Sequence, residues 1–413
     1  MPLTHSFFAP CPRGLEGALA AELQTLDAHA LAVTEGGVGF SGPLGLCYRV
    51  NLESRIASRV LWLVAQGNYR QEQDLFDAAY RQPWPDWFSP RSTIKVKVSA
   101  QRCPLKSLAF ATLRIKDAVC DRFSASTKTR PSVDTRQPDI RIDAFLEETR
   151  FTLYLDTSGE PLFKRGLRQA VTQAPLRENL AAGILQLAGW TPDQVLLDPM
   201  CGGGTILMEA AQMGRKIAPG LGRRFAFEKL ATFDAKAWGS LRDEARARQT
   251  PTAELAIYGS DLHGHALTRA RANLEAAGLA DAVRLKQANV LEIMPPAEEG
   301  ILLANPPYGV RLGGETMLAE FYPRLGDVLK QRFPGWRAYI FTADLRLPKL
   351  IRLAPTRRTP LFNGALECRL YEFKLLRGPA RGRLGNGCNT QETRKTAAME
   401  DHGVQESGKL RRS

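Results

Sequence analysis

The stretch Val195-Leu-Leu-Asp198-Pro-Met-Cys-Gly-Gly-Gly-Thr205, followed by Ile206-Leu-Met-Glu-Ala-Ala211, decides the fold. A short apolar run ends at an acid, three glycines follow, and a segment of good helix formers comes next. This order predicts a strand, a glycine turn and a helix. In such an arrangement, backbone N–H groups can approach a bound nucleoside closely.

Further apolar segments follow this strand and alternate with helix-like segments. Together with 195–198, the predicted strands cover 255–261, 283–287, 301–305 and 337–342. Alternation of this kind predicts an α/β fold, a doubly wound parallel sheet whose strand ends meet along one edge. Segments 351–354 and 367–373, separated by Pro360 and Asn363-Gly364, predict a closing antiparallel hairpin.

Three of these strands are followed by a polar side chain suited to a nucleoside. Asp198 ends the first strand, Asp261 ends the second and Asn289 follows the third. A carboxylate at the second strand end can accept both ribose hydroxyls, and the Asn289 oxygen can accept from an adenine amino group. A plain turn asparagine is the alternative for Asn289. The predicted cofactor-binding residues are Asp198, Pro199, Met200, Cys201, Gly202, Gly204, Thr205, Asp261, Leu262 and Asn289.

The glycine turn also excludes some cofactors. It lacks the Gly-Lys-Ser/Thr of a phosphate loop and the third glycine of the dinucleotide pattern, so a cofactor without pyrophosphate fits best. The two acids are farther apart than the roughly 20 residues of a plain βαβ unit. Residues 214–253 therefore read as an insertion, with a helix near 235–248.

The segment Asn305-Pro306-Pro307-Tyr308 is the more specific motif and supplies the predicted catalytic residues. The two prolines have no N–H and fix φ, which leaves carbonyls pointing into the cleft. The Asn305 oxygen and the Pro306 carbonyl can each accept one hydrogen of an exocyclic amine, while Tyr308 stacks on its base. Two acceptors stabilise the positive charge that grows on the amine as a methyl group arrives. The motif predicts an amino-group methyltransferase and leaves adenine, cytosine and guanine open.

Composition and charge indicate a globular protein that binds a polyanion. The 413 residues carry a net charge of +13, and 24% of them are charged. Between residues 91 and 141, twelve Lys or Arg stand against four Asp, which indicates a nucleic-acid face. No stretch reaches the roughly 20 apolar residues of a membrane span. The first twelve residues do not resemble a signal peptide, so we expect a cytoplasmic protein.

Cysteine and histidine usage predicts no metal site. The seven cysteines show no spacing typical of a zinc or redox pair, and we interpret them as free thiols. His263-Gly264-His265 has no second ligand cluster and is typical of a solvated loop.

The chain divides into five predicted parts. Residues 1–55 alternate strand-like and helix-like segments, including one strand over 33–40, and predict a small α+β module. Residues 56–157 begin helix-like and continue with a strand at 93–98, an amphipathic segment at 105–123 and two strands near 140–145 and 150–155. A linker at 158–175 precedes the catalytic part at 176–376. The composition of 377–413 predicts a disordered basic tail.

These motifs resemble the RlmL-type family of bacterial 23S rRNA guanine-N2 methyltransferases. The resemblance covers residues 5 to about 376 and rests on segments 13–16, 116–118, 133–141, 165–168, 198–205, 305–312 and 363–368. It implies a ferredoxin-like segment, a THUMP RNA-binding domain and a class I (Rossmann-like) domain that uses S-adenosyl-L-methionine. Two features depart from the family pattern. We expect the chain to lack the second domain, RlmK, that some members carry, and Asn289 stands where an aspartate is usual.

The resemblance also implies the substrate: N2 of a guanine in helix 74 of 23S rRNA, with the base flipped into the pocket. The partner would be 23S rRNA or a large-subunit assembly intermediate, with no membrane, metal or obligate protein partner. The predicted RNA-binding residues are Lys95, Lys97, Arg102, Lys116, Arg141, Arg165 and Arg168. Alternatives are a THUMP-family tRNA guanine-N2 methyltransferase, an adenine-N6 methyltransferase and a catalytically silent RNA-binding assembly factor.

Overall fold

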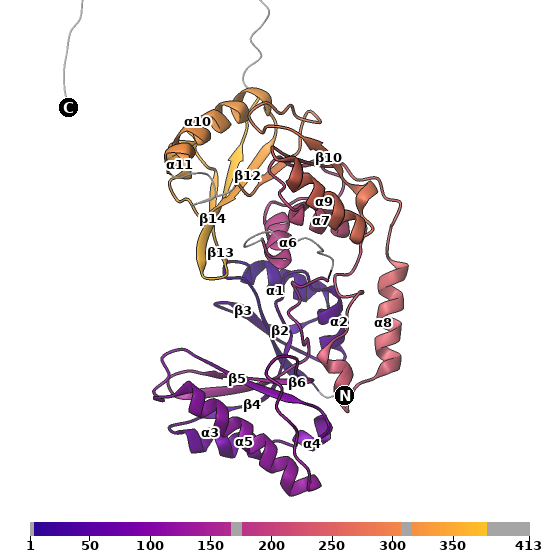
Figure 1. Cartoon of the computed structure of the whole chain (residues 1–413), viewed down its shortest axis with the longest axis vertical. Helices are drawn as coiled ribbons and strands as arrows, with labels where there is room; N and C mark the ends of the chain where they lie inside the picture. The colour runs from indigo at the N-terminus through magenta and orange to yellow at the C-terminus, as the bar shows by residue number, and fades with distance from the viewer. Residues whose placement is uncertain (1–3, 167–175, 307–314, 378–413) are drawn as a thin grey trace, which may run out of the picture. The chain divides into compact units, whose positions relative to one another are not determined.

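The computed structural model describes residues 4–166, 176–306 and 315–377, with the backbone alone at 315–318. The described part contains two seven-stranded sheets, one in each half of the chain (Figure 1). Pro307, Tyr308 and Arg168, and the predicted tail beyond residue 377, lie outside the described residues.

The first sheet is built by the N-terminal half and has the strand order β2-β3-β1-β4-β7-β6-β5. Its strands are β1 (His5–Pro10), β2 (His29–Thr34), β3 (Gly37–Gly42), β4 (Leu61–Asn68), β5 (Ile94–Ala100), β6 (Ile140–Leu146) and β7 (Arg150–Asp156). The helices of this half are α1 (Glu16–Thr25), α2 (Leu46–Glu53), α3 (Glu72–Tyr80), α4 (Trp84–Trp87) and α5 (Leu108–Thr127).

This sheet runs without interruption across the predicted boundary at residue 55. β1 pairs antiparallel with β4, with Phe7 opposite Trp62, and β4 pairs along its length with β7. The segment that resembles a ferredoxin-like module and the segment that resembles a THUMP domain therefore share one sheet.

Helices α3 and α5 pack together over one face of this sheet (Figure 1). The Ser107 side chain caps α5 by accepting from the Phe110 N–H at 3.2 Å. Buried and half-buried residues alternate along β6, so one face packs against the helices. Lys95 on β5 pairs with Arg141 on β6 and lies on the opposite face.

The second sheet has the order β10-β9-β8-β11-β12-β14-β13, and its first five strands are parallel. These are β8 (Leu196–Asp198), β9 (Ile257–Asp261), β10 (Arg284–Gln287), β11 (Ile301–Ala304) and β12 (Arg337–Thr342), followed by the antiparallel β13 (Arg357–Asn363) and β14 (Leu366–Lys374). The helices are α6 (Glu178–Leu187), α7 (Thr205–Gly214), α8 (Ala235–Ala247), α9 (Gly264–Ala276), α10 (Glu315–Arg332) and α11 (Leu347–Leu350), and the 3-10 turns are η1 (Ala226–Lys229) and η2 (Ala280–Ala282).

The two central strands, β8 and β11, explain why the sequence signal was clear here. Every residue of both strands is buried, as expected where helices cover both faces of a parallel sheet. Their apolar runs mark the place where the strand order reverses, which is where ligands bind in open α/β sheets. The predicted doubly wound fold with a closing antiparallel hairpin is confirmed.

Three predicted elements were wrong in detail. The single strand expected at 33–40 is two strands, β2 and β3, joined at Gly36, which has a positive φ. Strand β4 falls where a helix-like start was expected. The first arm of the closing hairpin is β13, not 351–354, and Pro360 lies inside it. Because β13 is an edge strand, a residue without an N–H is tolerated there.

Candidate active site

The predicted site residues meet at the carboxyl edge of the second sheet. β8 lies between β9 and β11, with Asp198 opposite Gly259 and Leu197 opposite Leu302. Asp261 ends β9 and Asn305 directly follows β11. The fold therefore brings Asp198, Asp261 and Asn305, spread over 108 residues of sequence, to neighbouring strand ends.

The glycine turn after β8 has the backbone conformation that its sequence predicts. Gly202 has φ +54° and Gly204 has φ +79°, where side chains are rarely accommodated. A Cβ on Gly204 would lie 3.3 Å from Ala270 on α9. The Cys201 N–H donates to the Ser260 carbonyl at 2.9 Å, which fixes the turn against β9. α7 begins directly after Gly204, so its N-terminus faces the turn.

Asp261 is joined to this turn by a hydrogen bond. One carboxylate oxygen accepts from the Gly202 N–H at 3.0 Å and the other from the His263 N–H at 2.9 Å. Each carboxylate oxygen can accept more than one hydrogen bond, so both retain capacity for a ligand hydroxyl. The carboxylate thus stabilises the glycine turn and can also accept from a ribose.

Asp198 is buried, with 1% of its surface exposed, and its carboxyl accepts from the Met200 N–H at 3.2 Å. Burial raises the pKa of this carboxyl to about 8; the Met200 N–H opposes the rise, and the charge of Asp261 adds to it. A substantial fraction of Asp198 is therefore protonated at neutral pH.

Leu262 follows Asp261 in the chain, and Asn289 lies two residues beyond Gln287, which pairs with Asp261. The Asn289 oxygen accepts from the Leu291 N–H at 3.0 Å, so it forms the turn that the sequence left open as the alternative to adenine recognition. Leu262 has 56% of its surface exposed although it is apolar. It offers an apolar surface next to the acid that ends β9.

The side-chain oxygen of Asn305 is unusual in its hydrogen bonding. Its Oδ1 is buried and has no hydrogen-bond partner among the residues that the structure describes, and Pro306 beside it is buried. Leaving a buried amide oxygen without a partner costs free energy, and such atoms tend to occur at functional sites. The other predicted catalytic residues, Pro307 and Tyr308, lie outside the described residues.

Asn273 on α9 is a site residue that the sequence analysis missed. It is 1% exposed, and its side-chain amide donates to the Gly203 carbonyl at 3.0 Å. This hydrogen bond fixes the glycine turn to α9. A single polar residue inside a helix pattern carries no sequence signal for such a role.

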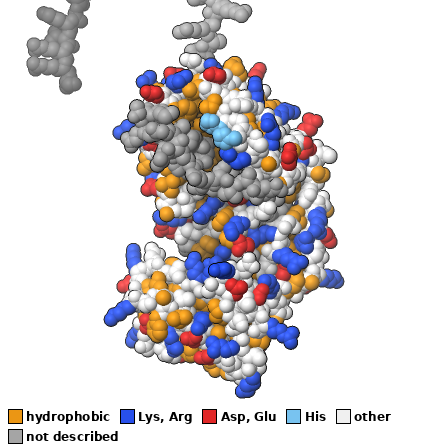
Figure 2. Space-filling view, in the orientation of Figure 1, with side chains coloured by type: hydrophobic (Ala, Val, Ile, Leu, Met, Phe, Trp, Pro, Cys, Tyr) orange, Lys and Arg blue, Asp and Glu red, His pale blue; other side chains and the backbone are white. Residues whose placement is uncertain are grey.

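The predicted RNA-binding residues are spread over the N-terminal half. Lys97 and Arg102 are exposed, while Lys95, Lys116 and Arg141 are half-buried. Several of these cations already have partners. Lys95 donates to the Thr135 carbonyl at 2.7 Å, Lys116 pairs with Asp117, and Arg141 forms two 2.9 Å bonds to Asp143. Figure 2 shows Lys and Arg side chains distributed over the visible face of the molecule.

Arg165 corrects one prediction. Its side chain is only 2% exposed and pairs with the buried Glu209 of α7 at 3.2 Å. A guanidinium in this position cannot reach an RNA phosphate, so Arg165 is removed from the RNA-binding set. Its role is taken up below.

No group of three His, Cys, Asp or Glu in the described part of the chain is placed to hold a metal ion. None of the described helices has the length and apolar character needed to cross a bilayer.

Three family models match the chain. A model of the RMKL-like methyltransferase domain matches residues 165–372, a THUMP domain model matches 69–156, and a model of the RlmL ferredoxin-like domain matches 6–61. The fold and the site define a Rossmann-like methyltransferase joined to an RNA-binding module. The chain belongs to the RMKL-like methyltransferase family.

Two relatives illustrate the extent of the similarity. The chain is 39% identical over 373 residues to a Synechocystis protein named "Putative RNA methyltransferase", covering 90% of this chain and 97% of that protein. It is 40% identical over 375 residues to Ribosomal RNA large subunit methyltransferase K/L of Shewanella amazonensis, covering 90% of this chain and 53% of that protein. The chain thus spans about half the length of the K/L relatives.

Solved structures agree on the fold across both halves. SMU.472, described as "a putative methyltransferase complexed with SAH", is 30% identical with a TM-score of 0.83, covering 92% of this chain and all of that one. A possible methylase from Clostridium difficile 630 is 28% identical with a TM-score of 0.85, covering 91% and 100% of the two chains. The expected family, its fold and its dependence on S-adenosyl-L-methionine are confirmed by these matches.

Proposed function

We propose that this protein transfers a methyl group from S-adenosyl-L-methionine to the exocyclic N2 of a guanine in 23S rRNA. The observation that carries the proposal is the buried Asn305 oxygen after β11, for which the described residues offer no hydrogen-bond partner. It lies at the same sheet edge as the glycine turn and Asp261. A cofactor on one side and an acceptor for an amine hydrogen on the other are the two parts that N-methylation needs.

The residues around the turn fit the cofactor. The ribose hydroxyls would bind Asp261, the backbone of the glycine turn would line the nucleoside, and exposed Leu262 would pack on the adenine. The N-terminus of α7 would face the carboxylate of the methionine part. Asn289, whose oxygen is already engaged, would contact adenine only through its remaining hydrogen-bonding capacity. Bound S-adenosyl-L-methionine supplies an electrophilic methyl group.

The chain's own residues orient the amine. The Asn305 oxygen and the Pro306 carbonyl would each accept one N–H of the substrate, which directs the nitrogen lone pair at the methyl carbon. As the N–C bond forms, the C–S bond breaks, and the amine loses one proton to solvent. Acceptors aimed at growing positive charge contribute roughly 10² to 10³ in rate. Tyr308 would stack on the flipped base.

The choice of RNA rests on the N-terminal half. A THUMP domain match and a net charge of +13 favour a polyanionic substrate over a protein. The choice of guanine N2 in helix 74 rests on the RlmL-type resemblance, and the names of the K/L relatives support 23S rRNA or a large-subunit assembly intermediate as partner. An rRNA substrate in turn favours the cytoplasm.

We also propose a division of the chain into parts. A ferredoxin-like segment at 1–55 and a THUMP domain at 56–157 would bind RNA, 158–175 would connect the halves, and 176–376 would carry catalysis ahead of a basic tail at 377–413. The family matches at 6–61, 69–156 and 165–372 support the order of these parts along the chain. The grouping of residues 1–376 into one compact unit supports the last of them.

The direct test uses purified protein, S-adenosyl-L-methionine with a labelled methyl group, and two unmodified RNAs. A 23S rRNA transcript should gain label that nucleoside mass spectrometry identifies as N2-methylguanine, and a tRNA mixture should gain none. Label in tRNA alone would identify a tRNA enzyme. N6-methyladenine as product would contradict the assigned base. This outcome is relevant because one similar structure is named a predicted N6-adenine-specific DNA methylase from Listeria monocytogenes. That structure is 29% identical with a TM-score of 0.82, covering 90% of this chain and 96% of that one.

A further inference from the structure

Arginine side chains bind five of the nine backbone carbonyls in the described part of the segment that joins the two halves. In the described part of this linker, residues 158–166, guanidinium groups from three arginines donate to backbone oxygens. The accepting carbonyls are those of Gly159, Glu160, Pro161, Leu162 and Lys164. A linker that only tethered two domains would leave these carbonyls to water.

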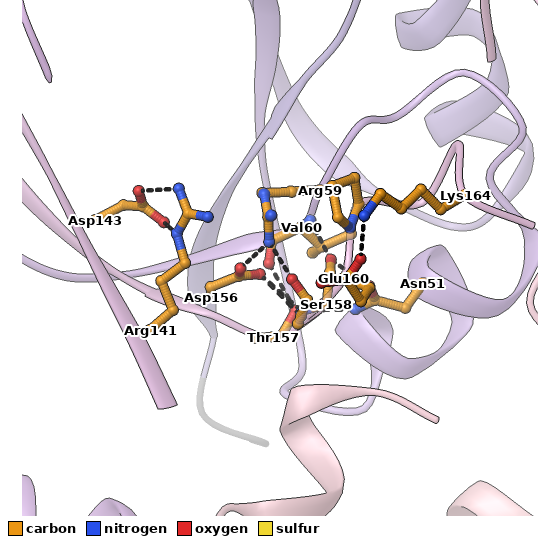
Figure 3. A network of polar contacts seen from close by, with 12 residues as sticks. Asn51, Arg59, Val60, Arg141, Asp143, Asp156, Thr157, Ser158, Glu160 and Lys164 are labelled. Carbon is orange, nitrogen blue, oxygen red and sulfur yellow. Dashed lines mark hydrogen bonds and ion pairs between the residues drawn. The ribbon is translucent and has the colours of Figure 1, made fainter. Parts of the chain in front are cut away.

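Arg59 anchors the start of the linker, where β7 ends (Figure 3). It forms an ion pair with the fully buried Asp156 and donates to the Gly159 carbonyl. The Asp156 carboxylate also accepts from the Ser158 N–H at 2.9 Å. The Ser158 hydroxyl donates in turn to Asn51 of α2 at 2.6 Å, so the first residues of the linker are bound to the first sheet.

Arg223, which lies in the insertion at 214–253, binds the middle of the linker. Its guanidinium donates to Glu160, Pro161 and Lys164 at 2.5, 2.8 and 3.3 Å. The insertion is itself docked on the N-terminal half: Phe227 stacks on Tyr48 with centroids 4.4 Å apart. This gives the insertion a structural task that the sequence did not reveal.

Arg165 connects the linker to α7, the helix that begins at the glycine turn. Its guanidinium donates to the Leu162 carbonyl at 2.7 Å, to the Arg55 carbonyl at 2.7 Å and to Glu209 at 3.2 Å. Glu209 is 1% exposed and lies in α7. One side chain therefore connects the linker, the N-terminal half and the cofactor helix.

These arginine side chains are better suited to fixing the backbone conformation of the linker than to raising the stability of the fold. Burying a charge pair is expensive, and apolar residues in the same space are often at least as stabilising. A guanidinium is planar and donates in fixed directions, so binding two or three carbonyls at once selects one backbone conformation. The linker therefore has a specified shape instead of a range of shapes.

We propose that Arg59, Arg165 and Arg223 form an arginine brace that sets a fixed span between the RNA-binding sheet and the cofactor turn. The methylated nucleotide is then selected by its distance from the stretch of RNA held by the N-terminal half. This inference rests on the proposed function. The three arginines bind the linker and are distinct from the residues assigned to the cofactor and the substrate, so they are positioning residues.

The test uses the full chain with Arg223→Gln, which avoids the fully buried Arg165, and Arg224→Gln as a matched control. Arg224 is the exposed neighbour of Arg223, so both variants lose the same charge. In Arg223→Gln, amide hydrogen exchange at 159–165 should rise, while affinity for S-adenosylhomocysteine and for a 23S rRNA transcript stays unchanged. Single-turnover methylation should fall roughly 10²-fold, the cost of misplacing reacting groups by about 1 Å, and methyl groups should appear at neighbouring nucleotides.

Two further results complete the test. Arg223→Lys should recover part of the rate because an ammonium can bind one carbonyl but not three, and Arg224→Gln should match the unmodified protein. The inference is overturned if Arg223→Gln raises exchange in the linker yet keeps its rate and single target, or if exchange does not rise. If the unmodified protein methylates no RNA, the proposed function fails instead, and the exchange measurement separates the two failures.

Discussion

Asp261, Asp198 and Asn305 show how one sheet edge gives three polar residues different properties. Asp261 is partly exposed and accepts from two backbone N–H groups, Asp198 is buried with a raised pKa, and Asn305 holds a buried oxygen without a partner in the described part of the chain. Each state predicts a different response to mutation. These responses separate cofactor binding, stability and chemistry.

Asp261→Ala should weaken S-adenosylhomocysteine binding while leaving RNA binding nearly unchanged. The variant loses the acceptors proposed for the ribose and the bond that supports Gly202. Charge-assisted hydrogen bonds contribute about 1.5–3 kcal/mol, so the loss in affinity should be roughly tenfold or more. Calorimetry measures it, with Glu275→Ala on the exposed side of α9 as control. Equal cofactor affinity in both variants would remove Asp261 from the cofactor site.

Asn305→Ala should lower single-turnover methylation by about 10² or more without changing cofactor affinity. Because the Asn305 oxygen has no partner among the described residues, its removal should not lower the melting temperature. Asn305→Asp keeps an acceptor and should retain more activity than the alanine variant. A near-normal rate in Asn305→Ala would exclude the residue from the mechanism, and a large loss of stability would point to a structural role.

The raised pKa of Asp198 predicts a pH-dependent stability. The folded protein keeps this carboxyl protonated up to about pH 8, whereas an unfolded chain releases the proton near the ordinary value of 3.8. The folded state binds more protons in that window, so the contribution of Asp198 to stability falls as pH rises from about 4 to 8.

Asp198→Asn removes this titration. The melting temperature of the variant relative to the unmodified protein should therefore rise steadily between pH 5 and pH 8, measured by thermal unfolding without cofactor. Asp193→Asn, a change at an exposed acid that precedes β8, provides the control. A difference between Asp198→Asn and the unmodified protein that stays constant over this range would contradict the assigned pKa.

At the scale of elements, the sequence predicted the catalytic sheet well because its central strands are buried on both faces. β8 and β11 appear as uninterrupted apolar runs that end in a polar residue. The N-terminal sheet was harder. β4 begins with the apolar run Leu61-Trp-Leu-Val-Ala65, and a short run of this kind cannot be told from a buried helix segment by periodicity alone, so the strand was missed.

Among the site residues, too, some could be predicted from the sequence and others could not. A turn with its glycines and a motif with two prolines can be found from local sequence because backbone geometry demands those residues. Arg165 could not be assigned in this way, since its partner Glu209 lies 44 residues away and a basic residue reads equally well as a phosphate contact. Contacts between distant segments, such as Asn273 with Gly203, are set by tertiary structure alone.

The face of the first sheet opposite α3 and α5 predicts a salt-dependent RNA contact. Lys97 on β5 is exposed there, and no partner for its side chain is seen in the described part of the chain. Lys97→Gln should reduce RNA affinity and lower the slope of log affinity against log salt by about one unit if one phosphate contact is lost. Lys236→Gln on the exposed surface of α8 should leave both unchanged. An unaltered slope in Lys97→Gln would show that this lysine is only solvated.

In the whole molecule, the linker at 158–166 connects the sheet of the THUMP-containing half to the sheet that carries the methyltransferase site. The family match and the fold support the catalytic class, while the target nucleotide depends on the resemblance to RlmL-type enzymes. The motif after β11 accepts any exocyclic amine, so geometry at the site alone does not choose the base. The proposed substrate, N2 of a guanine in 23S rRNA, therefore needs a direct test.

Nucleoside mass spectrometry of 23S rRNA and tRNA from a strain that lacks this protein tests that claim most directly. We predict that one N2-methylguanine disappears from 23S rRNA, maps to helix 74, and returns with the intact gene but not with Asn305→Ala. The tRNA modifications should be unchanged. Loss of N2-methylguanine from tRNA alone, or of N6-methyladenine from either RNA, would contradict the proposed substrate.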